Sequence, residues 1–395
     1  MTDGLNARGA GPVAGLRVLD FAHVFAGPFC TRTLADLGAD VVHVETHSRG
    51  GEDGRRSAYA HRNKRSIALD LKNAAGQATA VRMAGVADVI VENFSSGVMK
   101  RLGLGYEALS PATPRLIYVS MSGYGHTGPR REWTSMNMNL QAYTGLMLTT
   151  GAEGDPPTAI SNSWNDYIGG LHAVIAILHA LEDRHQTGRG RNIDLSQFEC
   201  SVATLGPLLM AASATGKPPK RMGNRSSVNA PQGVYPCAGE DEWCAVSVGT
   251  DDQWRALATA IDQPRLTQDP RFATMLGRMH NHDALDAAIA TWTRELPNDD
   301  VERRLQAVGV PAERMRRAEA VVNADDTGHV YKPVPGSNGK RPALAATVPF
   351  TFSASAISEI GPTTPLGAST REALRDWLNL SDAEIDELDR QQALV

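Results

Sequence analysis

Short apolar runs alternate with segments of helical periodicity between residues 16 and 120. Each run has the length and the Val, Ile and Leu content of a buried strand, and the runs are 16–20, 41–45, 66–70, 89–92 and 116–120. Helices are predicted between them at 31–37 after a turn at 25–28, at 74–84 behind the cap residue Asn73, and at 98–102. Strands that alternate with helices in this way predict a doubly wound α/β domain with a parallel sheet.

A long apolar helix is predicted within the stretch 161–184. Large aliphatic residues recur there at spacings of three and four, at Ile168, Leu171, Val174, Ile175, Leu178 and Leu181. Alanines fill most of the remaining positions, so we expect this helix to be buried on nearly every face. Its start carries a single acid, Asp166, followed by a tyrosine and the pair Gly169-Gly170.

Asp166 has two interpretations on these grounds alone. A carboxylate at a helix start faces free backbone N–H groups and can simply cap the helix. An ionised carboxylate beside an apolar wall can instead act as a covalent nucleophile, and two glycines in the first turn would let a ligand come close.

The composition changes after a strand at 192–196 and a helix at 198–214. The stretch 215–232 has no apolar run but many Pro, Lys, Arg and Asn residues, which is typical of a linker. Two strands and three helices then predict a small α+β domain, at 233–237, 243–248, 251–260, 282–295 and 299–307. After a segment rich in Pro and Gly, the chain closes with helices at 370–378 and 381–388.

We therefore expect three segments in order along the chain. They are a large α/β domain over 1–220, a small α+β domain over 228–325 and a C-terminal segment over 330–395.

Composition and charge narrow the possible functions. The 395 residues are 42% apolar and 21% charged, which is typical of a globular protein large enough for two domains. A balance of 39 basic and 44 acidic residues gives a net charge of −5, which argues against a role in nucleic-acid binding. No apolar run is long enough to cross a membrane, the N-terminus does not resemble a signal peptide, and the four cysteines follow no metal-ligand spacing. A cytoplasmic protein without a bound metal is therefore expected.

The loop 122–129 contains the pattern G-x-G-x-x-G directly after a predicted strand. A dinucleotide fold also needs a helix that begins inside this pattern and an acid at the end of a later strand, and neither follows here. We therefore do not interpret the loop as a nicotinamide site, and we interpret its His126 as a solvated turn residue rather than as a base. Basic pairs such as Lys64-Arg65 lie near strand ends, where converging arginines would suit a polyphosphate ligand.

A set of sequence runs follows one family in order along nearly the whole chain. The runs are 25–28 (FAGP), 34–42 (LADLGADVV), 63–72 (NKRSIALDLK), 87–94 (ADVIVENF), 101–106 (RLGLGY), 122–125 (SGYG), 187–190 (TGRG), 233–235 (GVY) and 365–367 (PLG). With them the chain resembles the family III CoA-transferases, which include formyl-CoA transferase and carnitine CoA-transferase and have α-methylacyl-CoA racemase as a relative.

The resemblance implies a fold and an assembly. The large domain should be Rossmann-like and completed by the C-terminal segment, with a smaller α+β domain beside it in the chain. Two copies should thread through each other as interlocked rings. The expected partner is thus a second copy in a homodimer, or a related subunit in a heteromer.

The resemblance also implies a site. Asp166 falls where the family keeps its catalytic aspartate. The positions that would bind coenzyme A are Phe25, Ala26, Leu69, Lys72, Asn93, Phe94 and Arg101, and the stretch 229–233 would approach the thioester. The implied reaction moves CoA from an acyl-CoA donor to a carboxylic acid acceptor, through an anhydride and an aspartyl-CoA thioester on Asp166. Coenzyme A enters as part of a substrate, and no metal is implied.

Two further hypotheses remain open. The racemase relatives use a His-Asp pair at the segment that corresponds to Met136-Asn137, where this chain has neither a histidine nor an acid. A racemase needs a second acid/base group on the opposite face of the α-carbon, so an α-methylacyl-CoA racemase or epimerase is ranked second. The active subunit of a heteromeric CoA-transferase is the other alternative, and it would also require Asp166.

Overall fold

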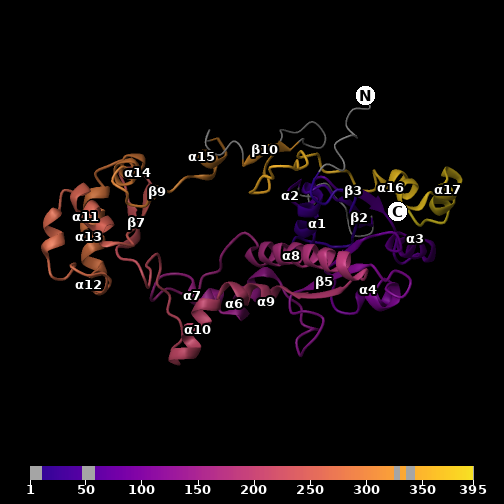
Figure 1. Cartoon of the computed structure of the whole chain (residues 1–395), viewed down its shortest axis with the longest axis horizontal. Coiled ribbons are helices and arrows are strands. Elements are labelled where there is room, and N and C mark those ends of the chain that lie inside the picture. The colour runs from indigo at the N-terminus through magenta and orange to yellow at the C-terminus, as the bar shows by residue number, and fades with distance from the viewer. Residues whose placement is uncertain (1–10, 47–57, 324–329, 335–342, 395) are drawn as a thin grey trace. The chain divides into compact units, whose positions relative to one another are not determined.

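Figure 1 shows a computed structural model of the chain, which describes residues 11–46, 58–323, 330–334 and 343–394. Its internal contacts divide the chain into two compact units. The first unit comprises Met1–Leu146, Ala159–Lys217 and Asp325–Val395, and the second comprises Met147–Thr158 and Pro218–Ala324. Residues 147–158, which we expected in the large domain, therefore belong to the second unit.

A parallel sheet of six strands lies at the centre of the first unit. Its order is β3-β2-β1-β4-β5-β6. The strands are β1 (Arg17–Asp20), β2 (Asp40–Glu45), β3 (Arg65–Ala68), β4 (Val89–Glu92), β5 (Ile117–Ser122) and β6 (Asn192–Ser196). Val18 of β1 pairs with Val41 of β2 on one side and with Val89 of β4 on the other, so the strand order reverses between β1 and β4. The predicted parallel α/β sheet is confirmed.

One face of the sheet is covered from both ends of the chain. Helix α3 (Ala74–Ala84) begins as predicted behind Asn73, whose side chain accepts the backbone N–H groups of Ala75 and Gly76. The same core contains α4 (Val98–Arg101), α5 (Tyr106–Leu109), α16 (Thr370–Leu378) and α17 (Asp382–Arg390). Trp377 of α16 donates its Nε1–H to Asp40 at 2.8 Å, and α16 lies beside β3 in Figure 1.

The other face carries helices α1 (Ala26–Asp36) and α8 (Trp164–Thr187), which pack against each other over the sheet. Helix α1 begins at Ala26, so the predicted turn at 25–28 and the predicted start at Thr31 are wrong. Pro28 is the third residue of α1, where a missing N–H is tolerated because the first turn has no intrahelical acceptor for it.

Helix α8 is not buried all round, which corrects the expectation from its apolar composition. Ala173 and Ile177 are fully buried against α1 and the sheet. Leu171, Ile175 and Leu178 lie on another face, where 44%, 64% and 39% of their surface is exposed. Apolar periodicity therefore located the helix correctly, but the chain covers only one side of it.

The predicted helix at 198–214 is two helices, α9 (Gln197–Thr204) and α10 (Gly206–Thr215). Pro207 breaks the continuity because it has no N–H to donate to the carbonyl four residues earlier. Shorter elements of the first unit are α2 (Ala58–His61), α6 (Asn137–Thr144), β10 (Tyr331–Val334) and β11 (Ala343–Ala346), and α7 (Leu146–Thr149) lies where the two units join.

The second unit contains an antiparallel sheet in the order β7-β8-β9. Its strands are β7 (Gln232–Pro236), β8 (Trp243–Ser247) and β9 (Ala312–Arg314), and its helices are α11 (Asp251–Ala260), η2 (Pro264–Gln268), α12 (Met275–His280), α13 (His282–Thr293), α14 (Asn298–Gln306) and α15 (Ala318–Asn323). Trp254, Leu257 and Ile289 belong to its separate core. Across the described parts of both units, no helix combines the length and apolarity needed to cross a membrane.

Candidate functional site

Two loops meet at the carboxyl edge of the large sheet, after β1 and β4. The amide of Asn93 joins them, because its Oδ1 accepts the backbone N–H of His23 at 2.7 Å and its Nδ2 donates to the His23 carbonyl at 2.7 Å. The ring of His23 lies edge-on to Phe94, with 4.8 Å between the ring centroids. Ligands of open α/β sheets bind where the strand order reverses, which is this place.

Val24, which follows His23 in the loop after β1, has a left-handed backbone with φ 63° and a side chain that is 80% exposed. A β-branched residue in this conformation is strained, and such strain concentrates at functional sites. The two hydrogen bonds between the Asn93 amide and the His23 backbone hold the chain just before Val24. The amide of Asn93 is therefore engaged in shaping the loop that leads to Phe25.

Helix α1 starts at this edge without a side-chain cap on its first turn. Phe25 is its N-cap residue, and the fully buried Ala26 is its first residue. Lys64 fixes the same turn, since its Nζ donates to the Pro28 carbonyl and to Asp20, each at 2.9 Å. An uncapped helix start leaves backbone N–H groups that can bind an anionic group of a ligand.

Asp166 lies one helical turn before Gly170, on the same face of α8. A Cβ added to Gly170 would lie 2.7 Å from Phe29 Cδ1 and 2.9 Å from the Ala26 carbonyl oxygen, so α8 approaches α1 closely there. The carboxylate of Asp166 is therefore on the side of α8 that faces the first turn of α1. Only glycine permits this approach.

The turn before α8 is also strained. Asn162 and Ser163 are both left-handed, with φ values of 66° and 54°. The N–H of Asp166 donates to the Ser163 carbonyl at 2.9 Å, and the side chains of the two residues are hydrogen-bonded. Two consecutive non-glycine residues in this conformation indicate that the surrounding structure fixes the position of Asp166.

Burial raises the pKa of Asp166 to about 6, although its hydrogen bond with Ser163 acts in the opposite direction. The positive end of the helix dipole favours the ionised form of this carboxylate, and here desolvation outweighs that effect. A carboxyl group with a pKa of about 6 is still mostly ionised at neutral pH. It is also less solvated than an exposed carboxylate, which favours its use as a nucleophile.

An aromatic cluster follows Asp166 directly. The Tyr167 ring lies edge-on to three rings, with centroid distances of 5.0 Å to Phe25, 5.0 Å to Phe29 and 6.1 Å to Tyr59. Burial and the neighbouring Tyr59 raise the pKa of Tyr167 to about 12. Phe25 is thus close to the residue that follows the candidate nucleophile.

The other expected coenzyme A residues are spread along the same edge of the sheet. Leu69 follows β3, but its side chain is fully buried in the core and its backbone N–H donates to the Glu45 carbonyl at 2.9 Å, so the structure does not support it as a side-chain contact for coenzyme A. Lys72 and Arg101 are exposed, the first between β3 and α3 and the second at the end of α4. The stretch 229–233 belongs to the second unit.

His126 is not the solvated turn residue that we expected. It is half-buried, its Nε2 lies 3.9 Å from Glu92 Oε1, and its backbone N–H donates to Asp194 at 2.8 Å. Burial raises the pKa of Glu92, whose carboxylate also accepts the Phe94 N–H at 2.8 Å. The glycine-rich loop is therefore anchored beside β4.

Sequence reasoning missed a network of neutral side chains around the start of α8. Asn165 is fully buried and is bonded to Asn137 of α6 and to Ser201 of α9. Gln141, also fully buried, bonds to Asn137. The only indication of this network in the sequence was a polar residue, Asn165, directly before the candidate nucleophile.

A cavity of about 620 Å³ lies at the opposite edge of the sheet and is lined in part by Asp40, Arg65 and Asp376. Asp40 and Arg65 begin their strands, so this cavity is at the amino edge and not beside the loops after β1 and β4. Among the residues that the structure describes, no three His, Cys, Asp or Glu side chains converge in a way that could hold a metal ion.

Known proteins are similar to this chain in both sequence and fold. The sequence pattern of CoA-transferase family III matches residues 13–370. Acetyl-CoA:oxalate CoA-transferase of Acetobacter aceti is 38% identical over 322 residues, which cover 79% of this chain and 82% of the relative. The alpha subunit of succinyl-CoA–L-malate CoA-transferase of Chloroflexus aurantiacus is 30% identical over an alignment of 405 positions, gaps included, which covers 95% of this chain and 91% of the relative.

The crystal structure of a CaiB/BaiF family protein from Brucella suis matches with a TM-score of 0.83 at 32% identity, over 93% of this chain and 100% of that chain. Sequence and fold thus agree over nearly the full length. They make this protein a member of CoA-transferase family III, whose enzymes use CoA thioesters as substrates.

Proposed function

We propose that this enzyme transfers CoA from an acyl-CoA to a free carboxylic acid, with Asp166 as the covalent nucleophile. The observation that carries the proposal is the half-buried carboxylate at the start of α8, on the face turned to the uncapped first turn of α1. The residues that would bind coenzyme A are Phe25, Ala26, Leu69, Lys72, Asn93, Phe94 and Arg101. The first six follow β1, β3 and β4 in the chain, and Arg101 ends α4.

The first half-reaction loads CoA onto the enzyme. A carboxylate oxygen of Asp166 attacks the thioester carbonyl carbon, the C–S bond breaks, and CoA leaves as a thiolate. The product is a mixed anhydride between Asp166 and the donor acyl group. The thiolate then attacks the Asp166 carbonyl carbon, which releases the donor as a carboxylate and leaves an aspartyl-CoA thioester.

The second half-reaction repeats these steps with the acceptor. The acceptor carboxylate attacks the aspartyl-CoA carbonyl carbon and displaces CoA thiolate. The thiolate then attacks the acceptor side of the new anhydride, which forms the acceptor acyl-CoA and restores the Asp166 carboxylate. One thioester replaces another, so the protein mainly has to hold CoA, exclude water and stabilise the oxyanions with N–H donors.

Trapping and substitution test this proposal together. Wild-type protein is incubated with acyl-CoA and borohydride or hydroxylamine, and the peptide that contains Asp166 is analysed by mass spectrometry. We expect an adduct on Asp166, and we expect Asp166→Ala to fold and bind CoA without detectable transfer. Turnover like the wild type in Asp166→Ala would overturn the assignment. A panel of carboxylic acids and acyl-CoAs, with this variant as the blank, then identifies the substrates.

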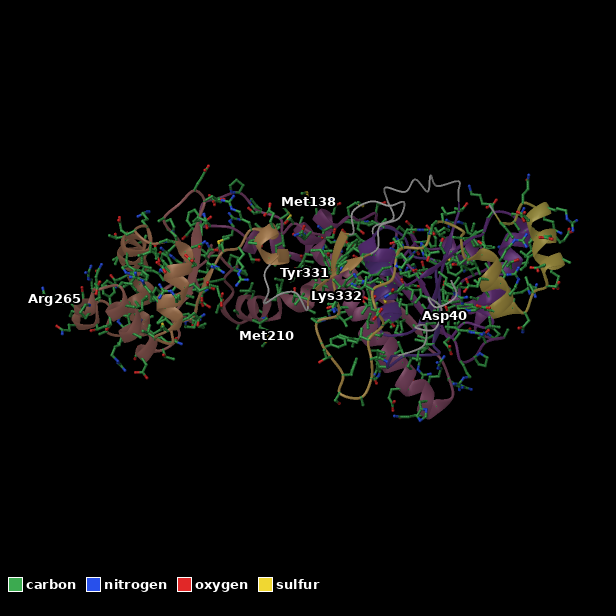
Figure 2. The ribbon with its side chains drawn as sticks, turned by 90° about the horizontal axis from the view of Figure 1, so that it is seen from above. Asp40, Met138, Met210, Arg265, Tyr331 and Lys332 are labelled. Atoms are coloured by element: carbon green, nitrogen blue, oxygen red, sulfur yellow. The ribbon has the colours of Figure 1, made fainter. Side chains whose placement is uncertain are left out.

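We further propose that the working form is an interlocked homodimer, as the family resemblance implies. Two surfaces of the first unit support this. The exposed stripe Leu171, Ile175 and Leu178 runs along α8, and α10 has no buried residue although it is strongly apolar. Met210 of α10 and Met138 of α6, both labelled in Figure 2, are 74% and 61% exposed. A second copy that covered these surfaces would remove apolar area from water.

Light scattering separates the possible assemblies. Two copies are expected from the purified chain alone, with Ile175→Lys reducing the dimer fraction. A chain that stays monomeric until a related subunit is added would instead support the heteromeric alternative.

The residue at position 137 does not provide the acid/base group that the racemase alternative requires. The Asn137 Oδ1 accepts hydrogen bonds from Asn165 and Gln141, and an amide cannot exchange a proton with an α-carbon. Deuterium exchange at the α-carbon of an acyl-CoA, without an acceptor acid, would reverse this ranking.

A further inference from the structure

We propose that Asn137 is a positioning residue, which sets the first turn of α8 and so aims the carboxylate of Asp166. The inference rests on the proposed role of Asp166 as nucleophile. It assigns to a neutral residue on α6 a function that acts on the nucleophile through Asn165.

Two hydrogen bonds, both donated by Asn165 and both accepted by Asn137, join the starts of α8 and α6. Asn165 donates its backbone N–H to Asn137 Oδ1 at 3.3 Å, and its side-chain Nδ2 donates to the Asn137 carbonyl at 2.9 Å. Asn165 has 0% exposure and Asn137 is half-buried, so the Asn165 ends of these bonds are shielded from water. A buried pair of hydrogen bonds fixes an orientation more firmly than an exposed pair.

The first turn of α8 needs Asn137 as a hydrogen-bond acceptor, because the side chain of its own N-cap residue does not accept any N–H of that turn. Ser163 is the N-cap residue, but its backbone is left-handed and its side chain makes no capping hydrogen bond. Its hydroxyl is engaged with Asp166 instead. The N–H of Asn165, one of the orphan donors of a helix start, is therefore satisfied by Asn137 from another helix.

Two neighbours hold the pair in place. Gln141, one turn further along α6, donates to Asn137 Oδ1 at 3.2 Å and to the Ile160 carbonyl at 2.7 Å. Ser201 of α9 donates to Asn165 Oδ1 at 2.8 Å. Three helices thus converge on the residue that precedes Asp166, and all of these groups are neutral side chains.

The neutrality has a consequence for the nucleophile. A carboxylate at position 137 could accept the same N–H groups as the amide, because the two side chains have nearly the same shape. It would also add a negative charge beside the turn that carries Asp166, which disfavours the ionised form of Asp166. Position 137 therefore controls both the aim and the ionisation of the nucleophile.

Two substitutions separate these effects. In Asn137→Ala, the acceptor is lost and we expect kcat to fall on the order of 10- to 100-fold, while KM for acyl-CoA changes by less than about threefold. In Asn137→Asp, the acceptor remains and we expect the acid limb of the kcat pH profile to move upward by about one pH unit. Both variants are compared with wild type between pH 5 and 8.

Asn379→Ala is the stability-matched control. Asn379 ends α16 in a left-handed conformation, with φ 53°, on the opposite face of the sheet from α8, so alanine there strains the fold without touching the site. A purely structural role for Asn137 predicts that both alanine variants lower the melting temperature and leave kcat and the pH profile unchanged, and this result would overturn the inference. Activity in Asp166→Ala would reject the proposed nucleophile separately.

Discussion

Two carboxylates near the carboxyl edge of one sheet have opposite environments. Asp20, at the end of β1, is fully buried, and burial alone would raise its pKa. The charges of Lys64 and His43 and a hydrogen bond from Thr31 more than compensate, so the pKa of Asp20 is held well below its usual range. Asp166 is only partly buried, yet with a single hydroxyl partner its pKa rises to about 6.

The difference shows that partners, more than depth, separate a structural carboxylate from a reactive one. Asp20 accepts the Thr31 hydroxyl at 2.6 Å, the Lys64 ammonium at 2.9 Å and the Ala22 N–H at 2.9 Å. Those bonds join β1, the middle of α1 and the residue before β3. Asp166 is left with lone pairs that no cation neutralises among the described residues, and such a group can react.

The largest effect should come from removing the partner of the structural carboxylate. Lys64→Met leaves the buried charge of Asp20 without its ammonium partner, and the remaining contacts with His43, Thr31 and the Ala22 N–H replace it only in part, so we expect a loss of about 3–5 kcal/mol in the free energy of unfolding. Urea denaturation at pH 7 measures it. The double variant Lys64→Met/Asp20→Asn should recover part of the loss, and no recovery would show that Lys64 acts through packing alone.

Removing the charge of the reactive carboxylate, Asp166, should raise the free energy of unfolding instead of lowering it. The pKa of Asp166 in the folded protein, about 6, lies above the ordinary value of 3.8, so ionised Asp166 costs stability above about pH 6 and the cost disappears as pH falls below about 4. Asp166→Asn should therefore raise the free energy of unfolding at pH 7 by about 1–2 kcal/mol, after allowance for its partial exposure. Thermal melts at pH 4 and pH 7 should show the gain only at the higher pH.

Activity should follow the same titration. Only ionised Asp166 can attack the thioester, so we expect kcat/KM to fall tenfold for each pH unit below about pH 6. Initial rates with one acyl-CoA and one acid, at constant ionic strength, give the profile. An acid limb near pH 4 would mean that the carboxylate is as well solvated as a surface group.

The smallest effect should come from the one hydrogen bond that lowers the pKa of Asp166. Ser163→Gly removes the hydroxyl and suits the left-handed backbone at this position, so the acid limb should move upward by about 0.5 pH unit without loss of stability. Asn162→Gly relieves the same kind of strain and keeps the hydroxyl, so it should leave the pH profile unchanged.

The sequence predicted the sheet and most helices because their signals are local. Apolar runs located β1 to β6, and Asn73 marked the start of α3 by a side-chain hydrogen bond to its own first turn. Two errors have different causes, the first non-local and the second local. Apolar content could not show that Leu171, Ile175 and Leu178 would remain uncovered, because burial depends on what packs against a helix. Pro28 indicated a turn, although the first turn of a helix tolerates it equally well.

The candidate site was less accessible to sequence reasoning. Residue type and spacing pointed to Asp166 but not to its environment, so the direction of its pKa shift was missed. Asn93 was expected as a ligand contact, and nothing in the sequence indicated that its amide would bind the backbone of His23, 70 residues away along the chain. Such roles depend on which loops the topology brings together.

Helices α16 and α17 cover one apolar face of β1, β2 and β3, and this has a consequence for synthesis of the chain. The backbone N–H of Asp70 donates to the carbonyl of Ala393 at 3.0 Å, and Trp377 bonds to Asp40. During translation, the apolar face that contains Leu19 and Ile67 stays uncovered until α16 and α17 have been synthesised. Products truncated before α16 should therefore expose this face and be captured by chaperones or proteases.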